Sequence, residues 1–151
     1  MFSRSLILTA ALVVALSSAR AATVDLSTAT IADINAAMDA GALTSEKLLT
    51  LYLKRIDAYD KQGPKVNSVI AINPNALAEA RALDVERKEK GPRTRMHGIP
   101  VVVKDLIDVV GMPTTAGFKP FGAPMPLRDA EVVARLRKAG AIILAKVNTV
   151  N

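Results

Sequence analysis

The stretch that decides the fold is IPVVVKD, residues 99–105. Its apolar run is too short for a helix and too rich in β-branched residues for a loop, so it predicts a buried strand over residues 99–103. A second apolar run predicts another buried strand over residues 141–145, and the alternation in residues 66–72 predicts a third strand. Helical spacing recurs before and between these runs. Helices interleaved with buried strands predict an α/β architecture.

Capping signals give the expected helix bounds. Thr30 with Asp33 has the spacing of a capping box, and the helix that it opens should end at Gly41. Thr44 or Ser45 should cap a second helix that ends at Gly63-Pro64. Two later helices are expected, one from Asn73-Pro74 to about residue 90 and one that Asp129 caps and Gly140 ends.

Composition excludes several classes of chemistry. The chain has 151 residues, which suits one domain, and it contains no cysteine and one histidine, His97. Thiol nucleophiles, cysteine-ligated metals and multi-histidine metal sites are therefore excluded within this sequence. The net charge is +6, but the basic residues are interleaved with acidic ones and aromatic residues make up 3%. No nucleic-acid partner is expected from that pattern.

The first 21 residues have the pattern of a secretory signal peptide. Arg4 supplies a basic start, residues 6–16 form an apolar run, and Ala19 and Ala21 are the small residues before the expected cleavage site. Cleavage before Ala22 predicts a secreted or periplasmic protein with residues 22–151 as the mature domain. The competing interpretation is a permanent membrane anchor, although the apolar run is shorter than the roughly 20 residues that span a bilayer.

Lys104 is the first candidate for chemistry because it follows the predicted buried strand directly. The carboxyl ends of strands in α/β sheets are where ligand sites gather. A lysine at a strand end is also commonly a solvated surface residue. The residues alone leave both interpretations open.

Several segments together resemble the opening of the amidase signature domain. They are HGIPVVVKD at residues 97–105, Asp108, MPTTAG at residues 112–117, and residues 129–146. The resemblance implies the N-terminal part of that fold, a mixed β-sheet flanked by helices that is incomplete in this chain. It also implies hydrolysis of a small-molecule or peptide amide by a Ser, cis-Ser, Lys triad without metal or organic cofactor. The family's lysine matches Lys104, which would act as the base.

The resemblance also suggests roles for the neighbours of Lys104. Strand alternation should send Asp105 to the opposite face, although Asp105 or Asp108 could instead hold Lys104 as a charged partner. His97 is expected to have a structural role, and Gly98 is expected to occupy a tight backbone turn. Residues 112–117 would either contact ligand or pack. Asn148 matches a family asparagine, but Val147 stands where a threonine is common.

The family's glycine- and serine-rich segment, which holds both serines, would follow Asn151. We therefore expect this piece alone to lack amidase turnover and to expose apolar strand edges that favour aggregation. Two alternatives are a non-catalytic remnant or interaction protein, and an A-type component of a tRNA-dependent amidotransferase. The predicted signal peptide argues against the amidotransferase.

Overall fold

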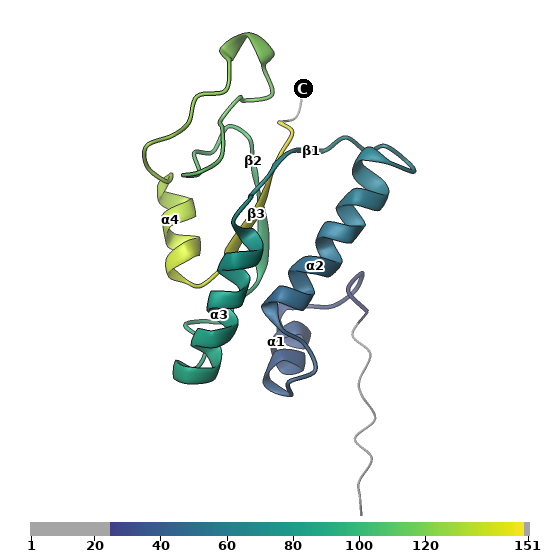
Figure 1. Cartoon of the computed structure of the whole chain (residues 1–151), viewed down its shortest axis with the longest axis vertical. Helices are drawn as coiled ribbons and strands as arrows, with labels where there is room; N and C mark the ends of the chain where they lie inside the picture. The colour runs from purple at the N-terminus through teal and green to yellow at the C-terminus, as the bar shows by residue number, and fades with distance from the viewer. Residues whose placement is uncertain (1–24, 150–151) are drawn as a thin grey trace, which may run out of the picture.

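A computed structural model describes residues 25–149 of the chain. The predicted signal peptide lies outside these residues. The described part has the expected α/β architecture, in which a three-stranded sheet is flanked by helices (Figure 1). Its strands are β1 (Val69–Ile72), β2 (Pro100–Lys104) and β3 (Ile142–Val147). The two strands predicted from buried apolar runs are thereby confirmed.

The sheet is mixed and has the strand order β1-β3-β2. β3 lies at its centre, antiparallel to β1 and parallel to β2. Residues 142–146 of β3 are all buried because a central strand is covered on both faces and paired at both edges. β2 is an edge strand within the described part, in agreement with the expectation that this piece exposes apolar strand edges. Its Val102 is 48% exposed.

The N-terminal helices begin where their caps predict. α1 (Ile31–Asp39) has the full capping box between Thr30 and Asp33. α2 (Ser45–Ile56) has Thr44 as its N-cap, with the hydroxyl accepting a hydrogen bond from the Lys47 amide. α2 continues into a π-helical turn, η1 (Asp57–Lys61), so the helical segment ends close to the expected Gly63.

Two helix starts differ from the prediction. α3 (Ala76–Lys90) begins after Asn75, and Asn73 does not cap it. The Asn73 side-chain oxygen accepts from the Asn75 backbone amide at 2.9 Å, and its side-chain nitrogen donates to the Ile143 carbonyl of β3 at 2.8 Å. α4 (Glu131–Lys138) has Ala130 as its N-cap without a side-chain bond. Asp129 does not cap α4, because its carboxylate accepts from the Val110 amide at 2.7 Å.

Apolar clusters lie on both faces of the sheet. α2 and α3 cover one face, where their buried residues contact Ile142 and Leu144 of β3. α4 packs against the other face through Val133, which lies with Val103 and Ile143. The neighbouring Val132 of α4 is 49% exposed. A third cluster joins α1 and α2 to Ile99.

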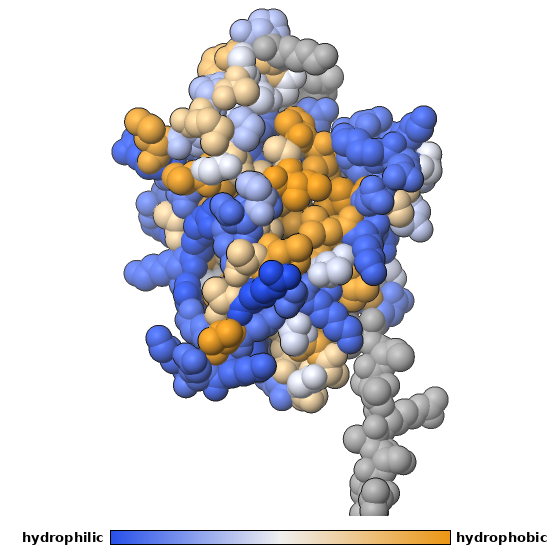
Figure 2. All heavy atoms as spheres, viewed as in Figure 1, coloured by the Kyte–Doolittle hydropathy of each residue, from blue (hydrophilic) through white to orange (hydrophobic). Residues whose placement is uncertain are grey.

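Part of the helix-covered face remains open. Figure 2 shows an apolar surface between α2 and α3, over β1. Ile72 of β1 is 45% exposed, and Leu53, Ile56 and Leu77 are only partly buried there. Within residues 25–149, no helix has both the length and the apolar character needed to cross a membrane.

Candidate functional site

Lys104 is the last residue of β2, at the carboxyl end of the parallel pair β2 and β3. Its side chain is exposed, and its Nζ donates to the backbone carbonyl of Asn148 at 2.9 Å. Asn148 follows β3, so the carboxyl ends of both parallel strands meet at this bond. The ion pairs found among residues 25–149 do not include Lys104. The amine is therefore held by a neutral acceptor.

Asp105 lies on the opposite face, as strand alternation predicts. Its carboxylate is fully buried, and Oδ1 lies 3.4 Å from Nζ of Lys146, which is also fully buried. The alternative in which Asp105 or Asp108 pairs with Lys104 is not what the structure has. Asp108 instead accepts a hydrogen bond from the Thr114 hydroxyl at 2.8 Å. The negative charge next to Lys104 in sequence is thus neutralised by a different lysine.

The segment after Met112 is organised by this buried pair. Lys146 Nζ donates to the Pro113 carbonyl at 2.9 Å and to the Thr114 hydroxyl at 2.7 Å. Asp105 Oδ2 accepts from the Thr115 hydroxyl, from the Thr115 amide at 3.0 Å and from the Gly117 amide at 3.3 Å. These five hydrogen bonds fix residues 113–117, which have no helix or strand of their own.

The environment of Asp105 favours its charged form. Burial raises the pKa of this carboxyl, but the Thr115 hydroxyl, the Gly117 and Thr115 amides and the charge of Lys146 lower it more. The pKa of Asp105 consequently lies below its ordinary value. Asp105 therefore remains a carboxylate at neutral pH, which matches its role as the acceptor for residues 115–117.

An open hollow of about 550 Å³ adjoins Asn148. It is lined by Ile70, Thr115, Gly117, Gly122, Ala123 and Asn148. Asn148 connects the hollow to Lys104, because its carbonyl accepts the lysine's hydrogen bond. Residues 115 and 117 thus pack on the buried pair and also line the hollow, so the two roles that we considered for this segment are not exclusive.

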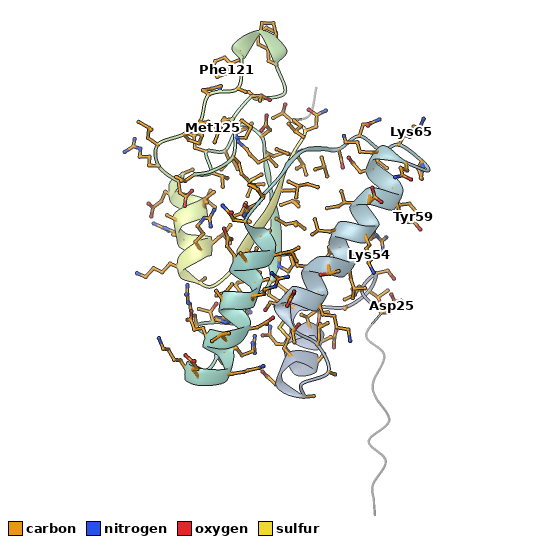
Figure 3. All side chains as sticks on the ribbon, viewed as in Figure 1. Asp25, Lys54, Tyr59, Lys65, Phe121 and Met125 are labelled. Atoms are coloured by element: carbon orange, nitrogen blue, oxygen red, sulfur yellow. The ribbon has the colours of Figure 1, made fainter. Side chains whose placement is uncertain are left out.

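The loop beyond the hollow carries exposed apolar side chains. Figure 3 shows Phe121 and Met125 on this loop, between β2 and α4. They are 62% and 55% exposed. A 3₁₀ turn, η2 (Lys119–Phe121), lies within this loop. An exposed loop of this kind can contact a ligand or another segment of protein.

His97 is structural, as expected. It is fully buried, its Nδ1 accepts from the Arg93 amide at 3.2 Å, and its Nε2 lies 2.9 Å from the Leu83 carbonyl. Because Nδ1 accepts, the proton belongs on Nε2, which donates to Leu83. Both ring nitrogens are used, so the ring has no free nitrogen for acid or base chemistry.

Gly98 is confirmed as a tight backbone position. Its φ is +78°, and a Cβ atom there would overlap the Ser45 hydroxyl oxygen. The serines of the described residues are Ser27, Ser45 and Ser68, and the Lys104 amine donates to Asn148 rather than to any of them. Residues 25–149 also hold no cluster of His, Cys, Asp or Glu side chains that could bind a metal ion.

The sequence did not indicate that Lys146 is buried and pairs with Asp105. Lys146 follows a buried run, as Lys104 does, and nothing local distinguishes a buried lysine from a solvated one at a strand end. What distinguishes Lys146 is the central position of its strand in the sheet, since a charge inside a central strand needs a buried partner. That position depends on contacts between residues far apart in the sequence.

The fold and the site define an α/β protein with a lysine at the carboxyl end of a parallel strand pair, beside an ordered glycine-containing loop. Comparison with known proteins gives the family. A family model described as Amidase matches residues 47–151. The chain belongs to the amidase signature family.

Its relatives include a probable amidase of Arabidopsis thaliana, 40% identical over 148 residues. They also include the A-type component of the glutamyl-tRNA(Gln) amidotransferase of Halorhodospira halophila, 42% identical over 125 residues. These alignments cover 93% and 79% of this chain but 28% and 24% of the relatives.

Solved structures agree with the sequence comparison. The native peptide amidase from Stenotrophomonas maltophilia matches with a TM-score of 0.75 at 43% identity, over 80% of this chain and 25% of that one. An amidase family protein from Bacillus anthracis matches with a TM-score of 0.77 at 41% identity, over 80% and 24%. The chain therefore spans about a quarter of the length of the relatives that it matches.

Proposed function

We propose that this chain supplies the lysine of an amidase, with Lys104 as the base of a Ser, cis-Ser, Lys triad that hydrolyses a carboxamide. The proposal rests on one observation. Lys104 lies at the carboxyl end of β2, exposed beside the hollow, and hydrogen-bonds to a carbonyl rather than to a carboxylate.

The chemistry follows from the family's triad. The unprotonated amine of Lys104 would take a proton from the bridging serine, which takes one from the nucleophilic serine. The nucleophile would then attack the amide carbonyl, and the C–N bond would break as the leaving ammonia or amine takes the proton from Lys104. Water would hydrolyse the resulting acyl-enzyme and release the acid. Both serines belong to the part of the family domain that follows Asn151. These 151 residues would thus contribute the base but not the nucleophile.

A hybrid enzyme tests the role of Lys104. Residues 25–149 would replace the equivalent segment of the Stenotrophomonas maltophilia peptide amidase, whose structure they match at 43% identity. The hybrid should hydrolyse a peptide amide, and Lys104→Met should lower kcat by about 10²- to 10⁴-fold, the range for a lost general base. Lys54→Met, at an exposed position on α2, is the matched control and should leave kcat unchanged.

The same experiment separates the alternatives. A folded hybrid that binds a peptide amide but does not hydrolyse it would support a non-catalytic remnant or interaction protein. The similarity to the amidotransferase component makes glutamine a second substrate to test. A hybrid in which Lys104→Met retains full activity would refute Lys104 as the base.

Export to a secreted or periplasmic location is a separate proposal, supported by the pattern of residues 1–21. Expression of the full chain in a Gram-negative host, followed by N-terminal sequencing of the periplasmic fraction, tests it. The expected first residue is Ala22. Recovery of uncleaved chain in the cytoplasm or the membrane would contradict export.

A further inference from the structure

We propose that Lys146 and Asp105 are positioning residues that hold residues 113–117 against Asn148 and thereby fix the place of the Lys104 amine. This inference rests on the proposed function of Lys104 for its catalytic meaning. The contacts that carry it lie entirely within the described residues. They form three successive steps from the buried pair to the amine.

The first step is from the pair to the loop. Lys146 and Asp105 are both 0% exposed, and together they make five hydrogen bonds to residues 113–117. Every one of these bonds has a charged partner, and such bonds are stronger than neutral ones. A buried pair with so many satisfied bonds prefers one arrangement of the loop, because other arrangements leave charged atoms without partners.

The second step is from the loop to the residues after β3. The Thr149 hydroxyl donates to the Ala116 carbonyl at 3.0 Å. A Cβ atom on Gly117 would lie 2.8 Å from the Thr149 hydroxyl oxygen and 3.0 Å from Asn148 Oδ1. The loop backbone therefore approaches Asn148 and Thr149 as closely as a glycine allows. A loop displaced from the buried pair would release this contact.

The third step is from Asn148 to Lys104. The Asn148 backbone amide donates to the Ser68 carbonyl at 2.7 Å, and the Asn148 backbone carbonyl accepts from Lys104 Nζ at 2.9 Å. The loop supports one side of Asn148, and the residue that precedes β1 supports the other. The position of the carbonyl that holds Lys104 thus depends on the loop, and the loop depends on the buried pair.

The experiment uses the full 151-residue chain and measures no turnover. Lys146→Met removes two donors and leaves the Asp105 charge unpaired, while Lys146→Met with Asp105→Asn removes both charges at nearly constant volume. Three quantities are measured: the thermal midpoint, hydrogen exchange of residues 113–117, and the rate at which acetic anhydride labels Lys104 relative to Lys54. Lys138→Met, at an exposed position on α4, is the matched control.

In Lys146→Met, we expect a lower midpoint, faster exchange in the loop and about three- to tenfold faster relative labelling of Lys104, the range for one lost hydrogen bond. The double variant should recover most of the midpoint, because no unpaired charge remains buried. It should keep the fast labelling, because Pro113 and Thr114 still lack their donor. The two variants would then separate the effect of the buried pair on stability from its effect on the position of the Lys104 amine.

Two results would overturn the proposal. In one, the double variant recovers both the midpoint and the original labelling ratio, so that the pair serves stability alone. In the other, the labelling ratio changes in neither variant. If Lys146→Met does not fold, Thr115→Val provides the test with both charges in place. It removes one hydroxyl bond to Asp105 and should raise the Lys104 labelling ratio by a smaller factor, and an unchanged ratio would count against the proposal.

Failure here is distinguishable from failure of the proposed function. If the labelling results hold but Lys104→Met leaves the hybrid enzyme active, the pair positions Lys104 without a role in catalysis. If Lys104 is essential but its labelling does not respond to Lys146, the base is confirmed and the positioning is wrong.

Discussion

Replacing Asp60 with asparagine should remove a pH-dependent part of the stability. Asp60 lies in η1 and is 4% exposed. Its Oδ1 accepts from the Ser68 amide at 2.7 Å, the Ser68 hydroxyl at 2.8 Å and the Val69 amide at 3.1 Å, and its Oδ2 lies 3.1 Å from Lys61 Nζ. These bonds hold the start of β1. Asparagine keeps an oxygen at the position of Oδ1 but removes the charge.

The magnitude follows from the pKa of Asp60. Burial raises this pKa, but the Ser68 hydroxyl, Lys61 and the amides of Val69 and Ser68 lower it from 3.8 to about 2. At about 1.4 kcal/mol per pH unit, this difference corresponds to about 2 kcal/mol of stability. Because the folded pKa is the lower one, the contribution is complete above pH 3.8 and is lost as the pH falls toward 2.

Urea unfolding of the parent chain and of Asp60→Asn between pH 7 and pH 2 measures this directly. We expect the parent to be more stable by about 2 kcal/mol at pH 7, with a difference that falls from about pH 4 and approaches zero at about pH 2. Asp57→Asn, an exposed position in the same turn, is the control and should show little difference. A stability difference of unchanged size near pH 2 would refute the electrostatic reasoning, since the difference would then arise from the shape of the side chain and not from its charge.

The remaining predictions concern the backbone, the histidine and the isolated chain. Gly98→Ala should destabilise the fold by more than about 3 kcal/mol, because its Cβ would overlap the buried Ser45 hydroxyl, whereas Gly41→Ala, with open space around it, should cost about 1 to 2 kcal/mol in urea unfolding. His97→Phe should cost roughly 2 to 4 kcal/mol, because the buried Leu83 carbonyl and the partly buried Arg93 amide lose their partners. These 151 residues alone should show no serine-inhibitor-sensitive amide hydrolysis, and turnover of that kind would contradict the proposal that they supply the base but not the nucleophile. On size exclusion the chain should self-associate through its exposed apolar surface, and a sharp monomeric peak would contradict this.

Local patterns predicted the elements well where the deciding contacts are local. The capping box of Thr30 and Asp33 spans one helical turn, so its residue types determine the start of α1 without reference to the rest of the fold. The β-branched runs predicted β2 and β3 for a similar reason. Gly98 was also predictable, since a positive φ is a property of one residue.

The two predicted helix caps that were wrong are polar side chains that hydrogen-bond to a distant segment. Asn73 and Asp129 each precede a helix and have the right residue type for a cap. Asn73 instead donates to Ile143, which is 70 residues away, and Asp129 accepts from Val110. A helix cap and a tertiary contact each require a particular orientation of the same side chain. Which one prevails depends on the sheet topology, and a local pattern does not contain that information.

The two lysines at the strand ends differ for the same reason. Lys104 and Lys146 each follow an apolar run, and their local sequences offer no reason to treat them differently. Because β3 is the central strand, Lys146 is buried and requires the carboxylate of Asp105. That ion pair neutralises the Asp105 carboxylate, which is the negative charge closest in sequence to Lys104. Asp105 therefore does not pair with the exposed Lys104 of β2, because its carboxylate pairs with the buried Lys146 of β3 instead.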